Sequence, residues 1–200
     1  MARTAHIIGN GDRAGMFKQP QKGIKITCNL PPFSVEGAYA TCLVDFKIMH
    51  AMHLQEIVIP GDWILGFRPH KYLEMNPDLR IRWGAQIRDY FTDKPPYAPT
   101  LTDWNCGHMA TRYACHPNKI GADTIHMYGF DSIFDMNLKS CSDFYLNSDR
   151  SDMNQVRLAD NWRPIWVKLF EEFPDKQFVL HHNHTTARID LPENVEIATK

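Results

Sequence analysis

The chain has 200 residues, of which 44% are hydrophobic and 12% aromatic, and its formal net charge is −1 at pH 7. This length and apolar content suffice for one well-packed domain and are too small for two ordinary ones, so we expect a single domain over residues 1–200. A net charge near zero provides no general positive field for a nucleic acid backbone, which makes nucleic acid an unexpected partner.

Cysteine usage and hydropathy favour a cytoplasmic protein without a membrane span. The cysteines are Cys28, Cys42, Cys106, Cys115 and Cys141. They form no C-x-x-C pair, and the start of the chain lacks the charged segment and apolar run of a signal peptide, so we expect reduced thiols. The longest apolar runs fall far short of the ~20 residues that cross a bilayer.

Short apolar segments alternate along the chain with polar or amphipathic intervals. We expect strands over 6–8, 24–28, 41–45, 56–59, 124–128 and 177–180. Helices are expected over 45–53, 107–118 and 160–172, the last ending at Pro174. The alternation predicts an α/β fold, namely a single Rossmann-like domain whose mostly parallel central sheet is flanked by helices.

One stretch, residues 61–102, interrupts this alternation. It is rich in proline and contains seven aromatic residues: Trp63, Phe67, Tyr72, Trp83, Tyr90, Phe91 and Tyr97. We predict a loop-rich aromatic insertion or lid here, because long connections in compact domains often bind ligands. Acceptor binding and burial in a homo-oligomer interface remain open alternatives.

The first strand runs directly into Gly9-Asn10-Gly11-Asp12. Glycines in such a turn let backbone N–H groups approach a phosphate, because no Cβ blocks the way and a following helix N-terminus favours negative charge. The turn therefore predicts a nucleotide site. An ordinary tight turn is the alternative, since the full G-x-G-x-x-G pattern is absent.

Four segments, in their order along the chain, resemble a known group of proteins. They are His6–Asp12, Ile24–Asn29, Asn105–Ala110 and Ile125–Asp131. The order resembles the family-42 sialyltransferases and related Rossmann-like proteins that include the archaeal 6-hydroxymethylpterin pyrophosphokinases. Those families read approximately I-x-G-N-G-P-S-L, a strand ending in C-N, S/T-S-G before a helix, and I-Y-L-x-G-I/Y-D. The resemblance implies a nucleotide or nucleotide-sugar donor in a crevice of the sheet.

The predicted donor-binding residues are Gly9, Asn10, Gly11, Asp12, Asn29, Asp45, Cys106, Gly107 and Asp131. Asn29 ends the second strand, where its amide can hydrogen-bond a base or ribose, and Asp45 and Asp131 place carboxylates on the same edge. In the resembling families the aspartate of the fourth segment lies near the donor. The alternatives are a strand-terminating Asn29, an ordinary N-cap around Gly107, and an Asp131 that caps the next turn.

Departures from the families affect the catalytic prediction. Asp12 stands where they have proline, which puts a negative charge, or a metal ligand, beside the expected phosphates. The segment 148–163 contains no histidine, although the sialyltransferases carry a general base there. We predict His108 and His116, or alternatively Asp149, as the replacement base and Arg150 as the partner of the leaving phosphate. A solvated surface pair is the alternative for Asp149 and Arg150.

Two further patterns carry other chemistry. His182 and His184 alternate in H-H-N-H, but two ligands leave a metal site incomplete and no carboxylate or cysteine is adjacent, so we expect a polar strand end and no metal. Cys106, at an expected helix N-terminus, is a candidate for a thiol with a lowered pKa.

The favoured function is a glycosyltransferase-like transferase that binds a nucleotide or nucleotide sugar and moves the glycosyl group to an unknown small-molecule or glycan acceptor. It requires no cofactor. One alternative is an ATP-dependent diphosphotransferase, for which Asp12, Asp45 and Asp131 would hold Mg²⁺. A non-catalytic nucleotide-binding module is the other alternative.

Overall fold

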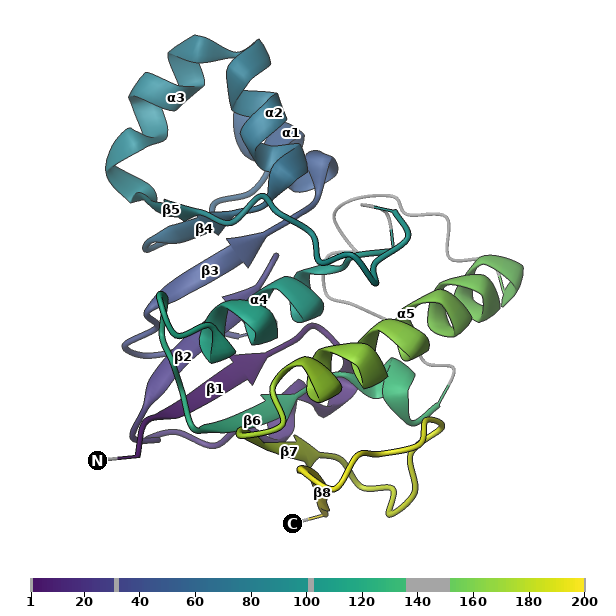
Figure 1. Cartoon of the computed structure of the whole chain (residues 1–200). Helices are drawn as coiled ribbons and strands as arrows, with labels where there is room; N and C mark the ends of the chain where they lie inside the picture. Colours follow the sequence, from purple (N-terminus) through teal and green to yellow (C-terminus); the bar gives the residue numbers. More distant parts are fainter. Residues whose placement is uncertain (1, 31–32, 101–102, 136–151, 200) are drawn as a thin grey trace.

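The computed structural model describes residues 2–30, 33–100, 103–135 and 152–199. Eight strands in these residues form one parallel sheet in the order β5-β4-β3-β2-β1-β6-β7-β8 (Figure 1). The strands are β1 (Thr4–Ile8), β2 (Ile24–Cys28), β3 (Ala40–Leu43), β4 (Trp63–Leu65), β5 (Ile87–Tyr90), β6 (Thr124–Tyr128), β7 (Gln177–His181) and β8 (Val195–Ala198). The α/β class and the parallel sheet are confirmed.

Helices cover both faces of the sheet. They are α1 (Phe46–His53), α2 (Phe67–Met75), α3 (Pro77–Trp83), α4 (Cys106–Cys115) and α5 (Asp152–Glu172), with short 3-10 turns η1 (Asp12–Met16), η2 (Gly84–Gln86) and η3 (Asp131–Ile133). Within the described parts of the chain, no helix combines the length and the apolar character needed to cross a membrane.

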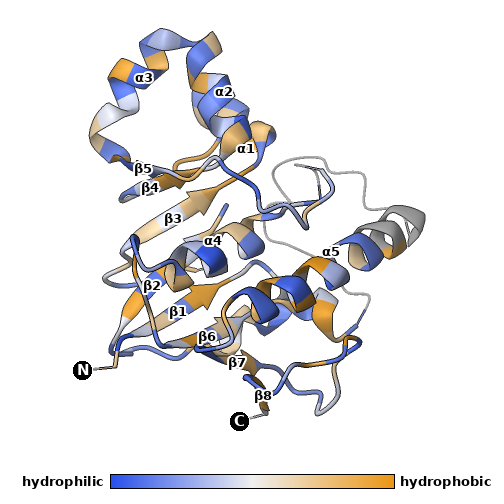
Figure 2. Cartoon of the chain, in the orientation of Figure 1, coloured by the Kyte–Doolittle hydropathy of each residue, from blue (hydrophilic) through white to orange (hydrophobic). Residues whose placement is uncertain are grey.

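Alternation along the central strands assigns residues to two cores. In β1, Ala5 and Ile7 belong to the core beneath α4 and α5, whereas Ile8 packs with Phe17 and Tyr128 on the opposite face. Figure 2 shows hydrophobic residues along the central strands and hydrophilic ones on the visible side of α5. This is the pattern of a parallel sheet that is covered on both faces.

The other face carries a second core at the β3–β5 end of the sheet. Leu43, Trp63 and Leu65 pack there against the apolar sides of α1, α2 and α3. The first two connections after β3 therefore run along one face, whereas α4 and α5, which precede β6 and β7, run along the other (Figure 1). The winding reverses between β1 and β6, and ligands of such sheets bind at this switch point, outside the carboxyl ends of the strands.

Several boundaries differ from the sequence-based prediction. The apolar segment 56–59 is not a strand: Ile57 and Ile59 are buried beside α1 in an extended connection, and β4 begins at Trp63 instead. β5 and β8 were not predicted, because four-residue edge strands with exposed positions give little alternation.

The stretch 61–102 also has more regular structure than its proline content indicates. It holds β4, α2, α3, η2 and β5, and it extends the sheet to its edge. Pro69 lies in the first turn of α2 and Pro77 is the first residue of α3, where a missing N–H removes no helical hydrogen bond. Apart from short links between elements, the part from Phe91 to Thr100 is the irregular portion of its described residues.

Candidate functional site

The residues predicted to bind a donor gather at the carboxyl edge of the sheet. The turn after β1, Asn29 after β2, Asp45 after β3, Asp131 after β6 and the start of α4 all lie at this edge. Asp149 and Arg150, two of the predicted catalytic residues, lie outside the described residues.

The glycine turn is joined to the loop after β6. The Gly9 amide donates to the Tyr128 carbonyl at 2.7 Å, and the Gly11 amide donates to the Gly129 carbonyl at 3.0 Å. A Cβ on Gly11 would lie 2.6 Å from the Gly129 oxygen and 2.8 Å from the Asp131 carboxylate, so only glycine allows this approach. Both amides are therefore used within the protein, and their contact with a phosphate stays a prediction.

Side chains link the next two strand ends. Asn10 donates through Nδ2 to the Leu30 carbonyl at 2.5 Å. Asn29, at φ +46°, donates through Nδ2 to Asp45 Oδ2 at 2.7 Å and accepts the Val44 amide at 3.3 Å. The predicted pair Asn29 and Asp45 is thus in direct contact.

The Asp45 carboxylate has a second partner that the sequence did not indicate. Arg68, in the first turn of α2, places Nη2 3.1 Å from Asp45 Oδ1. The side chains of Arg68 and Asp45 are 31% and 42% exposed, so the pair is accessible to a ligand from solvent.

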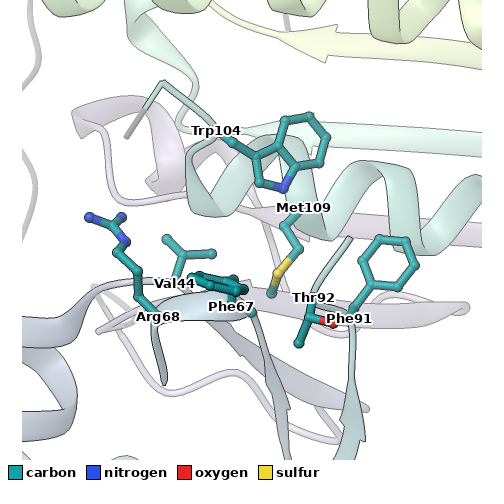
Figure 3. Close-up of a pocket in the computed structure, with 8 residues that line it drawn as sticks. Val44, Phe67, Arg68, Phe91, Thr92, Trp104 and Met109 are labelled. Atoms are coloured by element: carbon teal, nitrogen blue, oxygen red, sulfur yellow. The ribbon is translucent and has the colours of Figure 1, made fainter. Parts of the chain in front are cut away.

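A small pocket opens beside this ion pair, at the carboxyl ends of β3, β4 and β5. The empty space there is about 250 Å³ when open solvent is included, so the enclosed part is much smaller, and its lining is Val44, Gly66, Phe67, Arg68, Phe91, Thr92, Trp104 and Met109. Figure 3 shows the Arg68 guanidinium at one end, with Trp104 and Met109 on the α4 side. An apolar pocket with one cation suits a ring next to an anionic group.

Cys106 is not an activated thiol. Its Sγ donates to the Cys42 carbonyl at 2.8 Å, and the side chain is buried together with Cys28 and Cys42. Burial raises the pKa of the Cys106 thiol well above its ordinary value, and this outweighs its place at the start of α4. The prediction of a lowered pKa is wrong. Gly107 is there for packing, because a Cβ would overlap the Phe130 ring.

His108 is a capping residue. Its amide donates to Asn105 Oδ1 at 3.0 Å, its Nδ1 accepts the Asn105 amide at 3.1 Å, and the two contacts form a capping box at the start of α4. The ring is fully buried between Trp104 and Trp166, and burial lowers its pKa to about 3. The ring has no exposed face that could meet an acceptor, and its contacts are those of a capping and packing residue.

A carboxylate–histidine group lies at the ends of β6 and β7. Asp131 is 3% exposed and His182 is 1% exposed, and His182 Nε2 lies 3.8 Å from Asp131 Oδ1 and 3.9 Å from Asp135 Oδ2. Ligand atoms of Asp135, His182 and the exposed His184 all lie within 4.8 Å of one another. The sequence indicated no carboxylate adjacent to His182 and His184, and none is adjacent along the chain. In the folded protein Asp131 and Asp135 lie close to His182, so the expectation of no carboxylate partner is wrong.

Burial and charge act in opposite directions in this group. Burial, and then the nearby charges of Asp135 and Asp12, raise the pKa of Asp131 to about 6, while the Arg13 amide, which donates to Oδ2 at 3.3 Å, opposes the rise. Burial, and then the neighbouring His184, lower the pKa of His182 to about 4. The site thus concentrates negative charge around a neutral imidazole.

Three other histidines form a closed group on the opposite face of the same strands. His6 Nδ1 lies 3.3 Å from the Tyr128 hydroxyl, its Nε2 lies 2.9 Å from the Lys22 carbonyl, and His126 Nδ1 lies 2.9 Å from His181 Nε2. The Tyr128 and His181 rings are stacked at 4.2 Å. These contacts indicate packing and not a ligand site.

No protein-family model, no curated protein and no solved structure matches the chain. The chemistry of the carboxyl edge is therefore the guide to function.

Proposed function

We propose that the protein is a glycosyltransferase-like transferase that binds a nucleotide or nucleotide sugar at the carboxyl edge of its sheet, as its resemblance to the family-42 sialyltransferases implies. One observation carries the proposal. Four segments that are distant in sequence, at the ends of β1, β2, β3 and β6, lie along one edge of the sheet, and β1 and β6 flank the point where its winding reverses. In open α/β sheets this is the place where nucleotides bind.

A few residues at this edge make the contacts that would position a donor. Asn29 is held by Asp45 and the Val44 amide, so its position is fixed before a ligand arrives. Arg68 faces both Asp45 and the pocket, and a guanidinium there can form two hydrogen bonds with a phosphate. The apolar pocket walls would hold the base or the sugar ring. Donor orientation and charge neutralisation are thus the contributions that the described residues make to the reaction.

Ligand-induced stabilisation tests the proposal on the whole protein. We expect one of CMP, UDP, GDP, ADP or ATP, or a sugar conjugate of one of them, to raise the melting temperature, because a ligand at 100 times its Kd adds about 2.7 kcal/mol to the stability of the native state. Each ligand is measured with and without Mg²⁺. A rise with ATP that requires Mg²⁺ would favour diphosphate transfer, and no rise with any of them would contradict the proposal.

Two arginine variants locate the bound nucleotide. Arg68→Gln should weaken its affinity about tenfold or more, because a charge-assisted contact to phosphate is lost. Arg82→Gln, at an exposed position of α3, is the matched control and should leave the affinity unchanged. Equal affinities of the two variants would exclude Arg68 from the site. Turnover with a sugar donor then separates a transferase from a module that only binds.

A further inference from the structure

Two unpaired buried atoms lie together at the ends of β6 and β7 in the described structure. The buried side-chain atoms without a hydrogen-bond partner are His108 Nε2, Thr111 Oγ1, Asp131 Oδ1, Trp162 Nε1 and His182 Nε2. Three of them belong to neutral side chains around α4 and α5. The other two, Asp131 Oδ1 and His182 Nε2, face each other across 3.8 Å, which is too far for a hydrogen bond. Native proteins rarely leave such atoms unpaired, so a missing occupant is indicated.

The surrounding residues complete a set of metal ligands. Asp135 Oδ2 lies 3.9 Å from the same Nε2 atom, and a ligand atom of His184 lies within 4.8 Å of Asp135 and His182. The ligands of a tetrahedral ion with bonds of ~2.0–2.1 Å are about 3.4 Å apart. The two separations from His182 Nε2, 3.8 and 3.9 Å, are about half an ångström wider, and separations in the set reach up to 4.8 Å, so its side chains must move inward when an ion binds.

The fold positions both parts of the ligand set, the two aspartates after β6 and the two histidines after β7. Asp131 and Asp135 belong to the turn after β6, where the Asp135 amide donates to the Asp131 carbonyl at 2.9 Å. His182 follows β7 directly, and its ring stacks on Phe134 with centroids 4.0 Å apart and planes 1° from parallel. Because β6 and β7 are neighbours in the sheet, the two halves stay together.

We infer that Asp135, His182 and His184, with Asp131 as the fourth ligand, bind one divalent transition-metal ion of the zinc type. Two imidazole nitrogens and two carboxylate oxygens match the ligand preferences of zinc, whereas Mg²⁺ favours oxygen ligands alone. The ion would also offset the negative charge that Asp12 adds nearby. This site shares Asp131 with the predicted donor-binding residues, but its ligands do not include Asn29, Asp45 or Arg68, so metal binding can be measured separately from nucleotide binding.

The hydrogen bond from the His184 amide to His182 determines which ring nitrogen of His182 carries the proton before an ion binds. The His184 amide donates to His182 Nδ1 at 3.0 Å, so the ring proton of the metal-free protein is on Nε2. An ion at Nε2 takes the place of this proton, which moves to Nδ1, and the His184 amide must then turn away. Binding therefore rearranges the turn 182–184, and the affinity is lower than that of a preformed site.

Titration of the metal-free full chain with Zn²⁺ or Co²⁺ alone tests the inference. We expect one ion per chain by calorimetry, and visible Co²⁺ absorption of the four-coordinate type. His184→Ala and Asp135→Asn should weaken binding by ~100-fold, at or beyond the upper end of the 10–100-fold loss typical of residues that only support a ligand. Because His184 is exposed, its replacement leaves the fold intact.

An exposed histidine elsewhere provides the control. His50→Ala, on α1, should bind the ion as the unmodified protein does. Absence of one-to-one binding by either ion, or an unchanged affinity of both the His184→Ala and the Asp135→Asn variants, would overturn the inference. Neither result depends on whether a nucleotide binds, so the two proposals fail separately.

Discussion

His181 and His182 are adjacent in the chain and belong to two different kinds of histidine group. His181 points to the face where His6, His126 and Tyr128 contact one another, and ring nitrogens there have partners at 2.9–3.3 Å. His182 lies beside Asp131 and Asp135, and its Nε2 atom has no hydrogen-bond partner. Each group contains a buried histidine, His6 in one and His182 in the other, so burial identifies neither as a site. The difference lies in whether the buried polar atoms are satisfied.

The strongest way to break the closed group is to remove its central ring. His6→Ala deletes a side chain that is 3% exposed, together with its contacts to Tyr128 and the Lys22 carbonyl. We expect a loss of about 2–4 kcal/mol in the free energy of unfolding, from a cavity and lost hydrogen bonds. His184→Ala, in the other group, should change it by less than about 0.5 kcal/mol. Urea denaturation of both variants measures the contrast, and similar losses would erase the distinction.

Gly11→Ala tests whether the unpaired group depends on the glycine turn. The new Cβ would lie 2.6 Å from the Gly129 oxygen and 2.8 Å from Asp131, so either the turn or the carboxylate must move. We expect a destabilisation of about 1–3 kcal/mol and weaker Zn²⁺ binding. The control is Gly15→Ala, because a Cβ there meets nothing within 4 Å. Equal stability of the two variants would show that the contact is not tight.

His108, a buried histidine that belongs to neither group, makes the free energy of unfolding depend on pH. Burial lowers the pKa of His108 to about 3, below the ordinary value of 6.5, so below pH 6.5 the unfolded chain binds a proton that the native protein does not. The stability that His108 contributes is complete above pH 6.5 and falls by up to about 1.4 kcal/mol per pH unit on acidification.

The matched variant is His108→Gln, which keeps a side chain suited to the third position of a capping box. Its unfolding free energy should fall less steeply between pH 7 and pH 5 than that of the unmodified protein. The unfolding free energies of both proteins are measured by chemical denaturation at several pH values. If they depend on pH in the same way, His108 is accessible to protons in the native state.

The smallest expected change in stability comes from the accessible ion pair between Asp45 and Arg68. Asp45→Asn removes the charge that Arg68 faces, and because both side chains are about a third or more exposed, we expect a stability change of only about 0–1 kcal/mol. An amide oxygen in place of the carboxylate oxygen can still accept from Asn29 Nδ2, so we expect nucleotide affinity to rise because Arg68 becomes available for phosphate. A thermal melt and a binding titration measure the two quantities, and a large loss of stability would place this pair among the structural contacts.

The sequence predicted what local patterns can encode. β1, β2, β6 and β7 lie within two residues of their predicted bounds, because buried apolar runs of four to five residues ended at polar turns. The contact of Asn29 with Asp45 also follows from two neighbouring parallel strands that end together. Segment 56–59 was wrong because apolar composition reports burial and does not report strand pairing.

The remainder of the site depends on long-range geometry. Asp131 and His182 are 51 residues apart, and they meet only because α5 returns the chain to the strand next to β6. The available signal was the pair of polar clusters that end two consecutive strands, since such strands are usually neighbours. The role of His108 was missed for a different reason, because its burial between two indole rings depends on the packing of α5.

The position of β1 has a consequence for the synthesis of the chain. β1 is made first, yet one side of it pairs with β6, so its Thr4–Ile8 backbone has no β6 partner until residues 124–128 have been made. During that interval the first five strands present β1 as an open edge, which is the kind of surface that other chains can join. The Tyr128 and Gly129 carbonyls accept hydrogen bonds from the glycine turn, so this part of the carboxyl edge takes its shape only after almost two thirds of the protein has been synthesised.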